Sequence, residues 1–389
     1  MRNAVIGLII GIVAGIVLGT TVIAPRLAQN VKKEIGLAES DGSTSKDLPD
    51  TAATAEKETG KPTDPAPDVV RLNMASAFAE GLVGHGSLAK RLEKNVWRVS
   101  DGRLDIRFHP PGALVKDADA LDAVISGAID AYFTDMDALA SRDPSMTLLA
   151  GPPFGASVAA YLGWMAEGGG REQMLERMAE MGIAGAVCGI VPHAAGGWFK
   201  KPLKTAGDLK GMRIRATGVQ GDLYKKLGAD IVDFSYPETL IAMESGLVDG
   251  AQLSAPHVDL ALGAARGGWT YYVPGWRTPA RVFVLAMSKD KWDGLSEVQR
   301  SQVQTACSDN IRHAIAEGEA LQFDALKEII RKGADVRPWP AEVTDAVGNA
   351  WRDMAAEMQK SSRPYSRIQK SWRQFIKGQS IWEELARPK

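Results

Sequence analysis

Residues 208–252 read DLKGMRIRATGVQGDLYKKLGADIVDFSYPETLIAMESGLVDGAQ and carry the clearest indication of the fold. Short β-rich runs, GMRIRAT, ADIVDFS and LVDGAQ, alternate here with the helical stretches GDLYKKLG and ETLIAMESG. Such alternation is typical of parallel sheets covered by helices. The same alternation begins at Val69 and continues to the run RVFVLAMS at residues 281–288. The sequence therefore predicts an α/β body.

An internal repeat indicates that this body has two equivalent units. AVISGAID at residues 123–130 recurs as AMESGLVD at residues 242–249, after 119 positions. In each copy we expect a helix to end at a glycine in the left-handed conformation, Gly127 or Gly246, before a strand with a polar tip. The alternative is that two helix-glycine-strand junctions arose independently, as they can in any α/β protein.

The carboxy-terminal part reads as helical. Residues Glu297 to Lys332 form a long proline-free pattern with one apolar stripe, which ends at Gly333. A short strand, ADVRPWP, precedes a helical tail from Ala341 to Leu385. The large apolar residues of this tail must pack on the body or on another subunit; they are Trp351, Met354, Met358, Trp372, Phe375 and Trp382.

The amino terminus has the composition of a membrane anchor. Val5 to Ala24 is an uncharged, mostly apolar run of 20 residues, long enough to span a bilayer. We therefore assign residues 1–28 to an N-terminal membrane anchor or signal segment. An uncleaved anchor is favoured because Pro25 would follow a cut after Ala24. The flanking charges favour the opposite orientation, with the folded domain in the cytoplasm. One basic residue precedes the apolar run and three follow it closely, and the more basic side of a membrane span usually faces the cytoplasm.

Residues 29–68 have the composition of a disordered, acidic and proline-rich linker. Between Glu34 and Asp68 there are nine acidic and three basic residues and no aromatic one. The first aromatic residue of the chain is Phe78. The folded domain is therefore expected to cover residues 69–389, with lobes formed by discontinuous segments.

Composition and missing motifs exclude several functions. The chain has 46 basic and 47 acidic residues, so no nucleic-acid partner is expected. There is no Gly-x-Ser-x-Gly, phosphate-loop, dinucleotide or HExxH motif, and the five histidines lack metal-ligand spacing. We predict no enzyme, no catalytic residue, no metal and no cofactor. Cys188 and Cys307 are expected to be buried thiols, with a disulfide left open.

Residues 208–252 resemble the signature region of DctP-type solute-binding proteins of TRAP (tripartite ATP-independent periplasmic) transporters. The DLKG turn, the arginine-bearing strand, the helix ending in LG, the proline step and the VDG junction occur in the family's order. The resemblance extends to PPGALVKDADALDAVISGAID at 110–130, PPFG at 152–155 and AAGGWFKKPL at 194–203. YYVPGW at 271–276 is similar to the subgroup that binds 2-oxo acids and similar carboxylates with a metal ion.

The resemblance implies a two-lobed, Venus-flytrap periplasmic-binding-protein fold with long connecting helices and a helical C-terminal tail. It implies a periplasmic receptor that captures a small organic carboxylate for import, and the apolar run at residues 5–24 would tether this receptor to the inner membrane. Its partners would be the membrane subunits of a TRAP permease and, through the C-terminal helix, a second copy. The alternative is an anchored extracytoplasmic sensor that is not coupled to a permease.

The resemblance also implies ligand-binding residues. The family's carboxylate-binding arginine corresponds to Arg215, whose guanidinium can form two parallel bonds to a carboxylate. The chain departs from the subgroup at three positions, where Gln252 and Thr278 replace glutamates and Leu253 replaces a tryptophan. The loss of two carboxylates argues against metal-assisted binding. Alanines 138, 194 and 216, at positions with larger side chains in the subgroup, favour a bulkier or more apolar carboxylate. The other candidates for the same site are Phe78, Thr134, Trp198, Gln252, Trp276 and Thr278.

Overall fold

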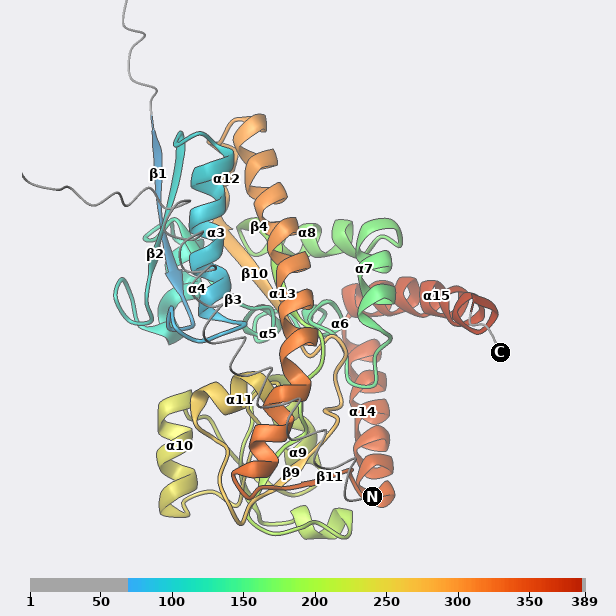
Figure 1. Cartoon of the computed structure of the whole chain (residues 1–389). Helices are drawn as coiled ribbons and strands as arrows, with labels where there is room; N and C mark the ends of the chain where they lie inside the picture. Colours follow the sequence, from blue (N-terminus) through green and yellow to red (C-terminus); the bar gives the residue numbers. More distant parts are fainter. Residues whose placement is uncertain (1–68, 387–389) are drawn as a thin grey trace, which may run out of the picture. The chain divides into compact units, whose positions relative to one another are not determined.

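The computed structural model of the chain describes residues 69–386, all within one compact unit (Figure 1). The predicted anchor and linker, residues 1–28 and 29–68, lie outside the described residues. None of the helices in the described part is both long enough and apolar enough to cross a membrane.

The first sheet has five strands in the order β2-β1-β3-β10-β4. β1 pairs in parallel with β2 and β3, whereas β10 runs antiparallel to both β3 and β4. Every residue of β10 is buried, which agrees with its apolar run between Arg281 and Ser288. The strands are β1 (Val70–Ser76), β2 (Leu104–His109), β3 (Ala131–Asp135), β4 (Ile183–Val191) and β10 (Arg281–Ser288).

The second sheet has six short strands in the order β11-β9-β5-β8-β6-β7. β6 is parallel to β7 and β8, and β9 is parallel to β11, but β5 is antiparallel to β8 and β9. The strands are β5 (Gly197–Phe199), β6 (Arg213–Arg215), β7 (Asp230–Val232), β8 (Gly250–Ala251), β9 (Thr270–Tyr272) and β11 (Asp335–Arg337).

Both sheets are mixed, so the expectation of parallel sheets is wrong in part. The chain leaves the first sheet after β4 and enters the second at β5, then returns from β9 to β10. β10 re-enters the first sheet at the end where β4 leaves it, and β10 therefore runs antiparallel to β4. The two-lobed α/β fold with a helical C-terminal tail is confirmed.

The helices follow the alternation that the sequence predicts. The longer ones are α3 (Gly86–Val99), α7 (Val158–Glu167), α8 (Gly170–Glu180), α9 (Gly218–Lys226), α10 (Tyr236–Ser245), α13 (Glu297–Arg331), α14 (Ala341–Ser361) and α15 (Arg363–Ala386). The shorter ones are α4 (Ala120–Ile125), α5 (Asp137–Ala140), α6 (Met146–Leu149), α11 (Pro256–Leu262), α12 (Lys289–Asp293) and the 3-10 helices η2 (Asp117–Asp119) and η3 (Ala206–Leu209).

Helix α13 is shared by the two lobes (Figure 1). Its amino-terminal part places Val303 in the core cluster that covers the first sheet, whereas Ile329 belongs to a core cluster of the second lobe. Between these parts, Gly318 lies against Pro192 at the crossing from β4 to β5, and a Cβ atom at residue 318 would come within 2.8 Å of the proline ring.

Cys188 of β4 and Cys307 of α13 form a disulfide, which corrects the expectation of free thiols. Both residues are buried as expected, and their Cα atoms are 4.1 Å apart. A spacing of 119 residues in the sequence carries no information about this contact, because it depends on how α13 packs on β4. A disulfide is typical of proteins outside the reducing cytoplasm.

The two copies of the internal repeat have the same local structure. Gly127 and Gly246 both adopt left-handed backbone conformations, with φ angles of 75° and 72°. Three residues later, each copy has an aspartate that precedes a strand and binds a neighbouring strand. Asp130 accepts the backbone N–H of Asn73 at 2.8 Å, and Asp249 accepts that of Arg213 at 3.0 Å.

The C-terminal helices pack on the protein's own body for most of their length. Val343 and Val347 of α14 and Ile368 and Trp372 of α15 belong to core clusters. The end of α15 differs, because three large apolar side chains there are exposed, namely Ile381, Trp382 and Leu385.

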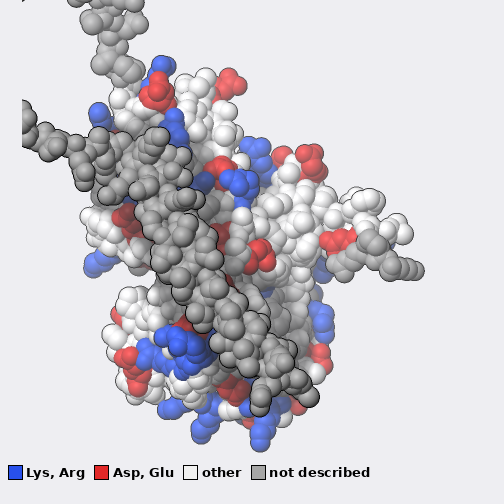
Figure 2. All heavy atoms as spheres, in the orientation of Figure 1, with Lys and Arg blue, Asp and Glu red and all other residues white. Residues whose placement is uncertain are grey.

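Charged side chains are unevenly distributed over the visible face. Figure 2 shows both signs interspersed over its upper part, whereas basic side chains predominate at the lower end. The segment around η3 contributes exposed Lys201, Lys204 and Lys210. Basic side chains therefore gather at one end of this face, although the net charge of the chain is only -1.

Candidate functional site

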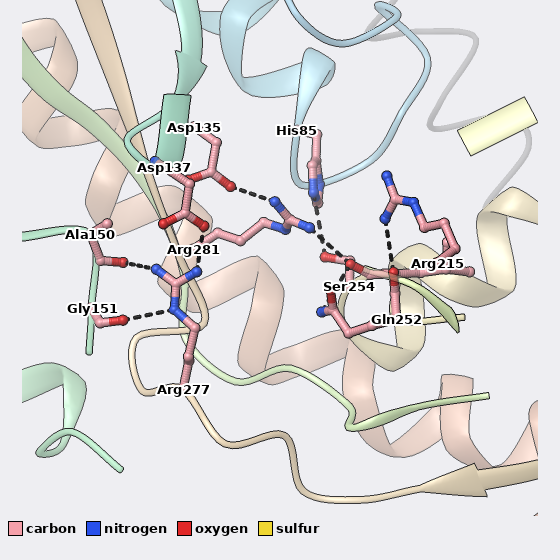
Figure 3. Close-up of polar contacts among 11 residues, drawn as sticks. His85, Asp135, Asp137, Ala150, Gly151, Arg215, Gln252, Ser254, Arg277 and Arg281 are labelled. Carbon is pink, nitrogen blue, oxygen red and sulfur yellow. Dashed lines mark hydrogen bonds and ion pairs between the residues drawn. The ribbon is translucent and has the colours of Figure 1, made fainter. Parts of the chain in front are cut away.

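The candidate site is built around residues 252–254, which follow β8 (Figure 3). The carbonyl oxygen of Gln252 accepts a hydrogen bond from Nη1 of Arg215 at 2.8 Å. That of Leu253 accepts one from Nη2 of Arg281 at 2.9 Å. The backbone N–H of Ser254 donates to Oδ1 of Asp259 at 2.8 Å. Three consecutive residues are thus held by charged side chains from three different elements.

Arg215 ends strand β6 and is only 6% exposed. Its Nε donates to the carbonyl oxygen of Phe234 at 2.9 Å, and its guanidinium lies 5.3 Å from the ring centre of Tyr236. Among the residues that the structure describes, no carboxylate forms an ion pair with Arg215. Burial lowers its pKa, but a guanidinium stays protonated in proteins. In the described part this buried positive charge therefore has no carboxylate in direct contact, and Asp233 and Asp259 act on it only from a distance.

Arg281 is the first residue of β10 and is equally well enclosed. It forms an ion pair with Asp135 at the end of β3 as well as the bond to Leu253. Burial by itself lowers the pKa of Arg281, but the neighbouring Tyr236 and Asp135 outweigh it and raise that pKa overall. Arg281 thus remains a fixed cation beside residues 252–254.

Arg277 forms a separate group of contacts. Its Nε donates to the carbonyl oxygen of Gly151 at 2.7 Å, its Nη2 donates to that of Ala150, and it pairs with Asp137. These bonds attach the connection between β9 and β10 to the loop after α6. We therefore interpret Arg277 as a structural anchor.

His85 approaches residues 252–254 from the lobe of the first sheet. His85 is the residue before α3 and is fully buried. Its Nε2 lies 3.4 Å from Oγ of Ser254. The imidazole meets Phe78 edge-on, with ring centres 5.1 Å apart, and Tyr236 at 6.1 Å. Burial, with a smaller contribution from Arg281, holds the pKa of His85 well below its usual value. The ring is therefore neutral at pH 7.

The structure brings some of the predicted site residues together and leaves others apart. Gln252 is bound directly by Arg215, and Phe78 contacts His85. Thr134 is buried in β3 immediately before Asp135. The remaining three contact neither Arg215 nor Arg281 among the described contacts.

Each of these three residues has a defined place. Trp198 is fully buried, stacks on Tyr271 and donates to Asp259 at 3.0 Å. Trp276 packs against Tyr224 and Trp339, and its Nε1 is buried without an acceptor in the described part. Thr278 is half-buried in the connection to β10. Ala194 and Ala216 are buried in core clusters, and Ala138 is half-buried in α5.

Sequence reasoning missed Arg281, Asp135, His85 and Tyr236. One signal was present, because Arg281 opens a strand that is otherwise continuously apolar, and a charge at such a place is either exposed or specifically paired. Its partner Asp135 lies 146 residues earlier, so the sequence offered no means of matching the two.

Comparisons with known proteins agree on one relationship. The family model described as "Bacterial extracellular solute-binding protein, family 7" (DctP) matches residues 74–362. A monocarboxylate 2-oxoacid-binding periplasmic protein of Nostoc sp. is 25% identical over 319 residues, which cover 81% of this chain and 86% of the relative.

Solved structures have the same fold. A TRAP transporter solute-binding protein from Bordetella bronchiseptica has a TM-score of 0.79 and 28% identity, covering 82% of this chain and 95% of its own. It was solved as a mixed-occupancy dimer with co-purified calcium and picolinate in one active site. One from Pseudoalteromonas atlantica, with bound sodium and pyruvate, has a TM-score of 0.76, 24% identity and coverages of 82% and 97%, and supports the fold alone.

Proposed function

The chain belongs to family 7 of the bacterial extracellular solute-binding proteins, the periplasmic receptors of TRAP transporters, and we propose that it captures a small organic monocarboxylate for import. Residues 69–389 would form the two-lobed receptor, and the ligand would bind where both lobes meet residues 252–254. A receptor needs no reacting group, and we assign no catalytic residue.

Arg215 carries the proposal. A buried charge without a counter-ion is unfavourable, and a ligand carboxylate would remove that penalty. Nε and Nη1 of Arg215 bind backbone carbonyl oxygens, whereas Nη2 has no acceptor among the described residues. The N–H donors of Nη2, at one edge of the guanidinium, therefore remain for an anionic oxygen.

We assign the remaining candidates to the same site as lining residues. Trp276 offers a buried indole N–H without a described acceptor, which suits a ligand oxygen. Gln252 offers a side-chain amide next to the carbonyl that Arg215 binds. Phe78, Thr134, Trp198 and Thr278 complete the proposed set.

The relatives suggest the ligand class. The Nostoc protein is named for monocarboxylate 2-oxo acids, and the Bordetella protein holds picolinate, which is also a monocarboxylate. A single carboxylate is what Arg215 alone can neutralise. We therefore favour a monocarboxylate over a dicarboxylate.

The donor groups do not fit a hard metal ion of the kind seen in the relatives. Sodium and calcium prefer several oxygen ligands, with carboxylates the strongest. Gln252 and Thr278 supply only neutral oxygens, and the carbonyl oxygen of Leu253 already accepts a bond from Arg281. We propose capture without a metal ion.

Membrane attachment and assembly are further parts of the proposal. The apolar run at residues 5–24 would tether the receptor to the inner membrane, and residues 29–68 would link that run to the receptor. The exposed apolar end of α15 would contact a second copy. The membrane subunits of a TRAP permease would receive the ligand.

The test is a binding screen with matched neutral compounds. Calorimetry would compare pyruvate, longer 2-oxo acids, picolinate and pyroglutamate with the methyl ester of each acid. We expect at least one acid to bind at micromolar concentration or below, and its ester to bind at least a hundredfold more weakly. Equal binding of acid and ester, or no binding by any acid to protein freed of co-purified ligand, would refute the proposal.

A further inference from the structure

Arg281 connects the two sheets. It belongs to β10 of the first sheet, where it pairs with Asp135 of the adjacent strand β3. On its other side it donates to the carbonyl oxygen of Leu253, two residues after β8 of the second sheet. One guanidinium therefore joins an acid of the first lobe to the backbone of the second.

The contact continues to the proposed ligand-binding arginine. The carbonyl groups of Gln252 and Leu253 belong to consecutive peptide planes that meet at the Cα atom of Leu253. A displacement of the Leu253 carbonyl that moves this shared Cα atom also shifts the peptide plane of the Gln252 carbonyl, which accepts the bond from Arg215. A continuous series of contacts leads from Asp135 through Arg281 and residues 252–253 to Arg215 (Figure 3).

We propose that Arg281 is a positioning residue for ligand capture: its bond to Leu253 forms when the lobes close and holds residues 252–254 where Arg215 can bind the carboxylate. The inference rests on the proposed function of Arg215. It goes beyond that function by assigning the transmission between lobes to a residue that does not itself bind the ligand.

A bond made only in the closed form has a kinetic signature. The ligand enters the open form, so the loss of this bond leaves the association rate constant nearly unchanged. Opening becomes easier, so the dissociation rate constant rises. A hydrogen bond to a charged group is worth roughly ten- to a hundredfold in an equilibrium constant, and we expect a rise of that size for Arg281→Met.

Arg277 supplies a matched control. It too is a buried arginine paired with an aspartate, and it too donates to backbone carbonyl oxygens. Those carbonyls belong to Ala150 and Gly151 rather than to residues 252–254. We therefore expect Arg277→Met to lower the melting temperature while the ligand's dissociation rate constant stays within threefold of the wild-type value.

Stopped-flow binding on the full-length protein, with a carboxylate from the screen, tests the rate constants. If Arg281→Met fails to fold because the buried charge of Asp135 is left unpaired, the double variant Asp135→Asn with Arg281→Met replaces it. The double variant has no unpaired charge at residue 135. An unchanged dissociation rate constant would overturn the inference. So would an equal rise in the Arg277→Met variant, because the effect would then be general destabilisation.

A second measurement needs no ligand. Spin labels at Ala118→Cys in η2 and Ile241→Cys in α10 report the separation of the lobes, and the native cysteines are not labelled because they form the disulfide. In ligand-free protein the open and closed forms are in equilibrium, so we expect Arg281→Met to reduce the closed population and shift the distance distribution towards longer values. An unchanged distribution overturns the inference even if no carboxylate binds, whereas a failed screen alone refutes only the proposed function.

Discussion

The indole of Trp198 stacks on the phenol ring of Tyr271, with ring centres 4.1 Å apart, and both side chains donate to the same oxygen of Asp259. The other oxygen of Asp259 accepts the backbone N–H of Ser254. This fully buried carboxylate therefore fixes the strand that carries Trp198 and one end of residues 252–254. Its ionisation is thus linked to the stability of the site.

Asp259 should impose a pH dependence on stability. Burial, opposed by its three hydrogen bonds, raises its pKa from 3.8 to about 6. The unfolded chain therefore loses this proton at lower pH than the folded protein, so the contribution of Asp259 is present below pH 3.8 and is lost as the pH rises to about 6. We expect that loss to be on the order of 3 kcal/mol.

Urea denaturation between pH 4 and 7 checks this pH dependence against Asp259→Asn. The variant should be less stable at every pH, because its single oxygen cannot replace both carboxylate oxygens. It should also lack the decline between pH 4 and 6. Parallel curves for the two proteins would show that Asp259 does not titrate in this range.

Arg215→Ala should abolish most ligand binding. A desolvated carboxylate would lose its cationic partner, which costs roughly 2 to 5 kcal/mol. Calorimetry at a temperature where both proteins are folded measures the loss. Arg213→Ala is the control, because Arg213 lies on the same strand but is exposed. Less than tenfold weakening by Arg215→Ala, or equal weakening by the control, would contradict the assignment.

Binding should not depend on sodium or calcium. Gln252 and Thr278 offer neutral oxygens where metal-assisted binding would need anionic ones. We expect the affinity of chelator-treated protein for its carboxylate to change less than tenfold when either ion is restored. Calorimetry in choline-based buffer measures this change, and a larger increase with either ion would show that a metal site exists.

The end of α15 should mediate dimer formation. Trp382 is 62% exposed, beside Ile381 and Leu385. We expect light scattering of wild-type protein to show a dimer at micromolar concentration and Trp382→Glu to show a monomer. Phe323→Glu, which changes a 71% exposed residue of α13, should stay dimeric. A wild-type monomer would contradict the proposal.

The sequence predicted local structure better than strand direction. The long helix expected at Glu297–Lys332 is observed at Glu297–Arg331, because a capping box at Ser296 begins it and Gly333 follows its end. The antiparallel direction of β10 was not predictable, since it depends on the chain's return from the second sheet. Local sequence patterns determine helices and strands, whereas the order and direction of the strands depend on long-range packing.

The residues of the candidate site also fall into a group that the sequence revealed and a group that it did not. Arg215 and Gln252 could be identified because both lie in one continuous stretch that carries the family resemblance. Arg281, Asp135 and His85 could not, because each acquires its role from a contact with a residue more than 25 positions away. A sequence motif reveals a binding group but not the groups that hold it.

The contact between Gly318 and Pro192 divides α13 into two arms of unequal length. At 1.5 Å per residue, the arm from Glu297 to the contact is roughly 32 Å long and the arm from it to Arg331 roughly 20 Å. A rigid helix that tilts about this fulcrum displaces its longer arm about one and a half times as far as its shorter one. The disulfide between Cys307 and Cys188 fixes the longer arm to the first sheet, so a rotation of the second lobe would act on the shorter arm, which carries Ile329 of the second lobe's core.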